Sequence, residues 1–208
     1  SVCLLSVLER LRTPFNLSLH AVYFDHGLRP KETPDEIDFC RDLCGSFSIS
    51  FEVKKIDVIG HAKTVKMSKQ ESARELRYHS LQEISKTLPA HKIALGHNAD
   101  DQAETILMRL FRGTGPSGLA GIPPVRNAII RPLIEVERRH IEQYLDTEGI
   151  GFMIDSSNLH DDYLRNRLRL HIMPEVKKLN PDAIKVMSRA ADICRDEERF
   201  FDIQITKI

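Results

Sequence analysis

This sequence of 208 residues lacks the patterns that mark several common classes of protein. No apolar run approaches the roughly 20 residues that span a membrane, and no secretory signal pattern is present, so we expect no membrane association. The four cysteines match neither a disulfide framework nor a zinc site, and none belongs to a CxxC pair. We therefore expect free, mostly buried thiols in a protein of the cytosol: Cys3, Cys40, Cys44 and Cys194.

The sequence also lacks a net charge. Its 30 Lys and Arg residues balance 30 Asp and Glu residues, so nothing in the overall charge indicates a nucleic-acid partner. A neutral protein can still bind RNA through a local basic patch, so RNA binding is not excluded. The length suits one good core, with room for a small appendage.

Apolar segments with strand character alternate with amphipathic segments of helical period. Strands are predicted at residues 17–24, 49–57, 92–95 and 127–134. Helices are predicted at residues 2–11, 33–47, 68–88, from about 98 to 112, 135–149 and 181–208. This alternation predicts an α/β fold with a doubly wound, mostly parallel sheet. We expect one domain over residues 1–170, followed by a helical linker or the start of a second domain over residues 171–208.

The stretch LGHNADDQAETILMRLFRGTGPSG, residues 95–118, carries more chemistry than a packing helix needs. Asn98 or Asp100 is expected to cap a helix whose apolar positions face a core; these are Ala103, Ile106, Leu107 and Leu110. His97, Asp101 and Glu104 fall on a different stripe, near the end of a predicted strand. Ligands bind at that edge of open α/β sheets, so these three residues are candidates for a functional site. An acidic first turn that matches the helix dipole is the alternative, and it leaves His97 and RGTGPSG unexplained.

Three further stretches place polar side chains at the ends of elements. FDHGLR puts Asp25 and His26 at a strand end, and ESARELRY places Arg74 on a capped helix. DSSNLHDDYLRNRLR, residues 155–169, puts Arg165 and Arg169 on one helical face, where they could bind phosphate or carboxylate. The alternative is a solvated basic face that pairs with the acids at 161 and 162.

The motifs DHGLR, ESARELRY, GHNADDQAET, RGTG, RPL, DSSN and RNRLR occur in this order. In this respect the chain, to about residue 175, resembles the catalytic domain of the bacterial tRNA(Ile)-lysidine synthetase family. That family belongs to the adenine-nucleotide α-hydrolase-like, N-type ATP pyrophosphatase group. The resemblance implies a cytoplasmic ligase that uses ATP and Mg²⁺ to modify the wobble cytidine of tRNA(Ile) with a CAU anticodon. The C2 oxygen of the cytidine is adenylated, and the side-chain amine of free L-lysine then attacks C2 to form lysidine.

The resemblance also assigns roles to residues at matching positions. The expected catalytic residues are Asp101, His97 and Glu104. Those expected at ATP are Ser1, Asp25, His26, Arg74 and Gly96. Those expected at lysine or the tRNA are Arg112, Gly113, Thr114, Gly115, Arg165, Asn166 and Arg169. No residue is assigned to a metal, and because family members are often dimers, a homodimer is one expectation.

One family motif is missing from these 208 residues. The family has a pyrophosphate-binding loop, SGGxDS, after its first strand, and its backbone N–H groups and the following helix bind phosphate. The sequence instead starts at SVCLLSVLERL, which is similar to the helix after that loop, with Ser1 as the loop's last serine. We therefore expect the first strand and most of the loop to be absent from this chain, which alone should bind ATP poorly.

Three other interpretations stay open. A small-molecule ATP-dependent amidating enzyme is possible, but it explains RGTGPSG and RNRLR less well, and two further interpretations involve RNA. A tRNA thiolation enzyme of the same fold is one, but the type that uses paired CxxC motifs for an iron–sulfur cluster is disfavoured because the sequence has no CxxC. The other is a non-catalytic RNA-binding remnant, which the missing loop favours and the intact His97, Asp101 and Glu104 stripe disfavours.

Overall fold

The computed structural model describes residues 1–88, 90–153, 161 and 163–206, which divide into two compact units. One unit is Leu5–Ile93, and the other joins Ser1–Leu4 to Ala94–Ile208. Helix α1, Val2–Arg10, begins in the second of these units and continues into the first.

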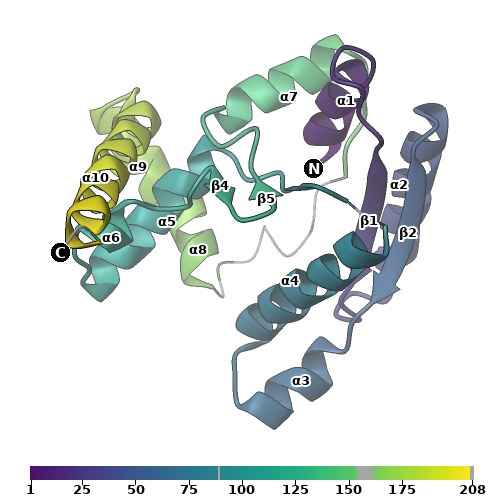
Figure 1. Ribbon diagram of the computed structural model, residues 1–208, viewed down its shortest axis with the longest axis horizontal. Helices are drawn as coiled ribbons and strands as arrows, with labels where there is room; N and C mark the ends of the chain where they lie inside the picture. Colours follow the sequence, from purple (N-terminus) through teal and green to yellow (C-terminus); the bar gives the residue numbers. More distant parts are fainter. Residues whose placement is uncertain (89, 154–160, 162, 207–208) are drawn as a thin grey trace. The chain divides into compact units, whose positions relative to one another are not determined.

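A parallel pair of strands forms the centre of the unit Leu5–Ile93. Strands β1 (His20–Asp25) and β2 (Ser50–Lys55) pair in parallel, and helix α2 (Thr33–Ser46) connects them (Figure 1). This βαβ unit is the arrangement that the alternating sequence pattern predicts. The first pair of residues in the ladder is His20 and Ser50. Strand β1 therefore begins three residues later than predicted, because β2 provides no hydrogen-bonding partner before Ser50.

Two helices follow β2. Helix α4 (Lys69–Thr87) confirms the predicted helix at 68–88, and the side chains of Ser68 and Glu71 form the predicted capping box. Helix α3 (Val58–Val65) was not predicted, because a helix of eight residues is too short to show a clear period. Its cap is Asp57, whose carboxylate accepts a hydrogen bond from the Gly60 N–H at 2.8 Å.

A second sheet has the strand order β3-β5-β4 and contains β3 (Ile93–Ala94), β4 (Val125–Arg126) and β5 (Ile129–Ile130). The predicted strand at 127–134 is wrong in extent, since β4 and β5 form a short antiparallel hairpin instead. Asn127 turns the chain there with φ 55°. Pro132 follows β5 and has no N–H to extend the ladder.

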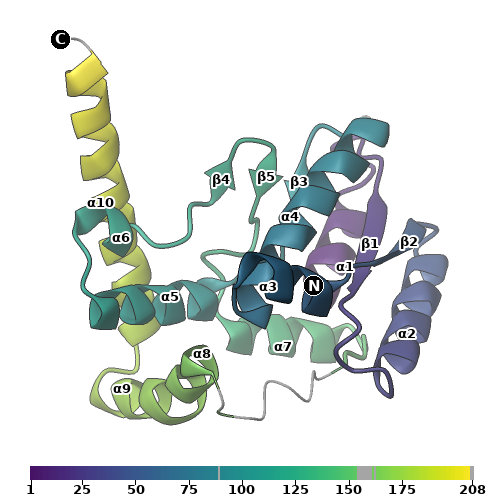
Figure 2. The same ribbon diagram turned by 90° about the horizontal axis from the view of Figure 1, so that it is seen from below.

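The rest of this unit is helical. The helices are α5 (Ala99–Arg112), α6 (Pro116–Leu119), α7 (Arg138–Thr147), α8 (Leu164–Arg167), the π-helix η2 (Leu168–Ile172), α9 (Met173–Leu179) and α10 (Ala183–Thr206). Figure 2 shows α10 crossing α5 and lying beside α6, and α10 contacts both helices. Among the described residues, none of the helices is both long and apolar enough to cross a membrane.

The core of this unit lies between α5 and the C-terminal helices. Its buried members are Ala99, Ala103, Leu107, Leu168, Met173 and Ile184. Ala103, Ile106 and Leu107 are buried as predicted, but Leu110 is 53% exposed, so that prediction is wrong. The buried stripe runs along α5 at intervals of four residues and stops at Leu107. Residues on both sides of position 170 share this core, and the predicted domain boundary there stays a prediction.

Candidate active site

The start of α5 is fixed by a reciprocal pair of hydrogen bonds. The Asp101 N–H donates to Asn98 Oδ1 at 2.9 Å, and the Asn98 N–H donates to Asp101 Oδ2 at 3.0 Å. Asn98 is therefore the cap, one of the two residues that the sequence suggested. The Ala99 N–H also donates to the Val136 carbonyl at 3.0 Å. These contacts hold the carboxylate of Asp101 in a defined position at the first turn.

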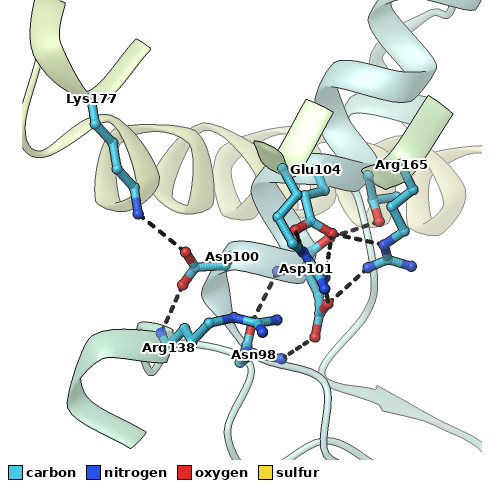
Figure 3. A network of polar contacts seen from close by, with 9 residues as sticks. Asn98, Asp100, Asp101, Glu104, Arg138, Arg165 and Lys177 are labelled. Carbon is cyan, nitrogen blue, oxygen red and sulfur yellow. Dashed lines mark hydrogen bonds and ion pairs between the residues drawn. The ribbon is translucent and has the colours of Figure 1, made fainter. Parts of the chain in front are cut away.

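Asp101 and Glu104 on α5 meet Arg165 and Arg169, which follow more than sixty residues later in the chain; Figure 3 labels Arg165. Arg165 donates from Nε to Glu104 at 2.7 Å and from Nη2 to Asp101 at 2.9 Å. Arg169 donates from Nε and Nη2 to the two oxygens of Glu104, at 2.7 and 3.0 Å. Its Nη2 also lies 3.4 Å from Asp101 Oδ1. We call Asp101, Glu104, Arg165 and Arg169 the acid–arginine cluster.

The acid–arginine cluster is partly shielded from water and formally neutral. The Glu104 side chain is only 2% exposed, whereas those of Arg165 and Arg169 are 30% and 21% exposed. Burial of the Arg169 guanidinium disfavours its charge, but the hydrogen bond and charge of Glu104, with Asp101 and Asp100, outweigh burial and raise the pKa of Arg169. Each carboxylate oxygen in the cluster accepts at least one hydrogen bond, one of them from the Asn98 N–H. The cluster is thus a closed set of two anions and two cations that can exchange partners with a ligand.

The two arginines reach α5 from one continuous helical segment formed by α8 and η2. They are four residues apart and contact the same two carboxylates, so they share a face as predicted. The turn widens at η2, where the Met173 N–H bonds to the Leu168 carbonyl. Pro174 explains the wider turn, because it has no N–H for the carbonyl of Leu170 and its ring would crowd that group.

The alternative pairing of these arginines with Asp161 and Asp162 finds no support in the described contacts. Asp161 lies 3.3 Å from Nε2 of His171, and both arginines point to α5. Position 162 and the DSSN motif at 155–158 lie outside the described residues.

Asp100 and Asp101 are adjacent, but they have different partners. Asp100 accepts the backbone N–H of Arg138 at 2.7 Å, at the start of α7, and lies 3.3 Å from Nζ of Lys177 (Figure 3). Its carboxylate therefore caps α7 and ties α5 to α9, which is a structural role.

A loop that follows α5, residues 113–122, is held by three side chains that the sequence reading did not single out. Gln102 accepts from the Ile122 N–H at 2.6 Å and donates to the Ile122 carbonyl at 3.2 Å. Arg109 donates to the carbonyls of Gly118 and Gly121, at 2.8 and 3.0 Å. Arg195 on α10 donates to the Ala120 carbonyl at 2.9 Å. Of these three residues, only Gln102 could have been noticed in the sequence, because it is a polar residue on the buried side of α5.

Four of the residues predicted at lysine or the tRNA lie at and beyond the far end of α5, away from the acid–arginine cluster: Arg112, Gly113, Thr114 and Gly115. Gly113 ends the helix with φ 78°, and Gly115 precedes α6. Thr114 donates from Oγ1 to the Gly115 carbonyl at 3.3 Å. Arg112 is 11 residues beyond Asp101, which corresponds to about 16 Å along the helix axis. The structure therefore separates these residues from the cluster.

The residues expected at ATP are divided between the two units. Ser1 and Gly96 lie together, since a Cβ on Gly96 would come within 3.2 Å of the Ser1 backbone. Asp25, His26 and Arg74 belong to the other unit, where Asp25 accepts the Gly27 N–H at 2.9 Å. Arg74 lies over the Tyr78 ring, on the rim of a hollow of about 360 Å³.

The backbone at Gly96 lies close to the start of helix α1. The glycine lets the end of β3 approach the start of α1 closely, and a helix N-terminus attracts anions. His97 is half-buried immediately after Gly96, and Asn166 is buried beside Arg165. Among the described residues, no group of three or more His, Cys, Asp or Glu side chains is placed to hold a metal.

Comparison with known families agrees with this architecture. Residues 1–176 match the PP-loop domain model, and the chain belongs to that family. Its fold is the adenine-nucleotide α-hydrolase type that the sequence predicted.

The chain is similar to several curated proteins named tRNA(Ile)-lysidine synthase. It is 40% identical to the one from Clostridium acetobutylicum over 93% of this chain and 42% of that protein. It is 39% identical to the one from Clostridioides difficile, over 97% of this chain and 44% of that protein, and 42% identical to the one from Thermosipho africanus, over 87% and 42%. The chain thus spans less than half the length of these relatives.

A solved structure is also similar, that of the U34-tRNA thiolase NcsA from Methanococcus maripaludis with its iron–sulfur cluster. The TM-score is 0.74 over 92% of this chain and 66% of that one. At 19% identity, this likeness shows the fold alone.

Proposed function

We propose that this chain is the catalytic domain of a ligase that joins lysine to C2 of the wobble cytidine of tRNA(Ile) with a CAU anticodon. The observation that carries the proposal is the acid–arginine cluster, whose four charges complement those of free lysine. The names of the curated relatives support the same reaction.

The cluster suits lysine because both ends of the ligand are charged. The guanidinium groups of Arg165 and Arg169 match an α-carboxylate, which they bind in two-pronged geometry. The carboxylates of Asp101 and Glu104 match the side-chain ammonium. Lysine binding would then exchange ion pairs within the protein for ion pairs that the lysine carboxylate and side-chain ammonium make with the same four residues.

The same carboxylates are suited to prepare the attacking amine. Activation transfers the AMP group of ATP to the C2 oxygen of the cytidine and releases pyrophosphate. The side-chain amine of lysine gives up a proton, its nitrogen bonds to C2, and the C2–O bond breaks as AMP leaves. Asp101, at 15% side-chain exposure, is the better placed of the two to take that proton, and His97 is a second candidate for proton transfer.

The residues proposed for ATP are Ser1, Gly96, Asp25, His26 and Arg74. Mg²⁺ is proposed to enter bound to the nucleotide phosphates, because Mg²⁺ sites usually combine a few carboxylates with substrate phosphate. Arg112, Gly113, Thr114 and Gly115 are proposed to contact tRNA.

The direct test measures lysine transfer. The full-length gene product is mixed with ATP, Mg²⁺, radiolabelled lysine and a tRNA(Ile) transcript that carries CAU, with a UAU transcript as the control. Label in the CAU transcript alone supports the proposal. Absence of label while AMP and pyrophosphate form would move the substrate to another RNA or a small molecule, as in a thiolation-like enzyme.

Two alternatives have weaker support. The described cysteines are separate free thiols and the sequence has no CxxC, which disfavours the thiolation type that uses paired CxxC motifs. A non-catalytic RNA-binding remnant would show no AMP formation in the same assay. Light scattering on the same preparation tests the expected homodimer.

A further inference from the structure

The last turn of α5 exposes two large apolar side chains. Leu110 is 53% exposed and Phe111 is 62% exposed, although the turns before them are buried. Phe111 continues the stripe of Ala103 and Leu107, but it lies beyond the residues that cover that stripe. An exposed aromatic ring that is followed directly by an arginine and a glycine-containing loop indicates a site for a binding partner.

The sequence around Phe111 is strongly basic, although the chain as a whole is neutral. Residues 105–134 contain four arginines and no Asp, Glu or Lys: Arg109, Arg112, Arg126 and Arg131. The whole chain has 30 Asp and Glu residues among 208, yet none falls in this segment. A segment with this charge favours an anionic partner, such as a nucleic acid, over a protein surface of mixed charge.

The four arginines divide into two pairs. Arg109 and Arg131 bond to backbone carbonyls, Arg109 to Gly118 and Arg131 to Pro123. Within the described part of the chain, exposed Arg112 and Arg126 make no ion pair or side-chain hydrogen bond. Helix-dipole matching accounts for a cation in the last turn of α5, but it does not account for the exposed ring beside it.

The loop that follows Phe111 is held by side chains at residues 118–122. Gln102, Arg109 and Arg195 hold the loop after α5 by hydrogen bonds to its peptide groups. A loop that is already held limits the backbone ordering that binding requires, which favours affinity. Single-stranded nucleic acids bind to surfaces that combine an aromatic platform with nearby cations.

We propose that Phe111 is an RNA-binding residue on which an unpaired base of the substrate RNA stacks, while Arg112 binds the adjacent phosphate. This inference rests on the proposed function and deepens it, because it names a base-stacking contact that Arg112 and the glycines alone do not provide. Phe111 lies about 15 Å from Asp101 along α5, so the stacked base is a nearby base and not the reacting cytidine itself.

The test is the affinity of the full-length gene product for a fluorescently labelled CAU anticodon stem–loop, measured by anisotropy at several KCl concentrations. Phe111→Ala is expected to weaken binding about tenfold at every salt concentration, because stacking is not ionic. Phe111→Tyr keeps the ring and is expected to stay within about twofold of the wild type. Arg112→Ala is expected to reduce the slope of log affinity against log salt by about 0.7, and Arg112→Lys to keep it.

Phe15→Ala is the matched control, since Phe15 is 66% exposed but lies in the other unit and should leave the affinity unchanged. Wild-type affinity in Phe111→Ala would overturn the inference, as would a changed oligomeric mass with RNA binding intact, which would assign the ring to a protein contact.

Failure of the inference can be told apart from failure of the proposed function. A wild-type protein that transfers lysine, with Phe111→Ala binding RNA equally well, contradicts the inference alone. A wild-type protein that binds RNA but transfers no lysine contradicts the proposed function alone. In that case the RNA affinities of the wild type and Phe111→Ala still test the inference. A wild-type protein that binds no RNA contradicts both.

Discussion

Glu104 and Arg169, 65 residues apart in the chain, form the most buried ion pair of the candidate site, with Nε and Oε1 2.7 Å apart. The Glu104 side chain is 2% exposed and its oxygens are shared between two arginines. A carboxylate in this position holds α8 and η2 against α5, and under the proposed function it also supplies negative charge for the lysine side chain.

Glu104→Gln is expected to lower the free energy of unfolding by about 2 kcal/mol. Removing one partner of a buried pair costs about 3–5 kcal/mol, and the partial exposure of the two arginines reduces this. The measurement is urea unfolding, with Glu175→Gln as the control. Glu175 is 66% exposed in its pair with Lys178, so its loss should change stability by less than about 0.5 kcal/mol. Equal effects of the two variants would contradict the structural role of Glu104.

Asp101→Asn is expected to lower the rate of lysine transfer about 100-fold or more while the fold stays intact. The amide oxygen of asparagine can still accept the Asn98 N–H, but the side chain can no longer take a proton. The measurement is single-turnover lysine transfer, compared with thermal unfolding. Asp100→Asn is the control, because Asp100 contacts Arg138 and Lys177 and should affect stability more than rate. Near-normal transfer by Asp101→Asn would remove Asp101 from the mechanism.

Gly121→Ala is expected to lower the free energy of unfolding by about 2–3 kcal/mol. Gly121 has φ +65°, and a Cβ there would lie 2.5 Å from Gln102 Oε1, which would disturb both hydrogen bonds between Gln102 and Ile122. Gly45→Ala is the matched control, since a Cβ on Gly45 in α2 would meet nothing within 4 Å. That substitution should leave stability unchanged or raise it. Urea unfolding that shows no difference between the two alanines would contradict the account of the loop.

The stability of the fold is expected to fall as the pH rises above about 9. Burial raises the pKa of the Cys44 thiol, and burial with the neighbouring Cys44 raises that of Cys40, from an ordinary value of 9.0. Below that pH the thiols are protonated in both states; above it the unfolded chain releases protons more readily than the native one, so unfolding is favoured. Urea midpoints measured between pH 7.5 and 10 test this. The decline should be smaller in Cys44→Ala than in Cys194→Ala, and equal declines would argue against a contribution from Cys44.

Local features of the site could be read from the sequence, because they depend on residues a few positions apart. The cap at Asn98, the stripe of Asp101 and Glu104, and the buried positions Ala103 and Leu107 all follow from helical spacing. The prediction failed at Leu110, since spacing does not tell where the covering helices end.

Contacts between distant segments could not be predicted. Nothing local to Arg165 or Arg169 shows that their partners lie on α5 instead of one turn earlier in their own segment. Likewise, α7 begins at Arg138 because Asp100 accepts its N–H, and that cap comes from another helix. Family resemblance named these residues but not the ion pairs among them.

The most direct test of the central claim, that the acid–arginine cluster binds lysine, compares lysine with cadaverine, which has the same amines but no carboxylate. In the wild-type protein kcat/KM should favour lysine over cadaverine by about 10- to 100-fold, the usual worth of a charge-assisted hydrogen bond. Arg169→Ala should lower this ratio towards one, because damage common to both amines cancels in the ratio. An unchanged ratio in Arg169→Ala would contradict the claim and would place the lysine carboxylate elsewhere.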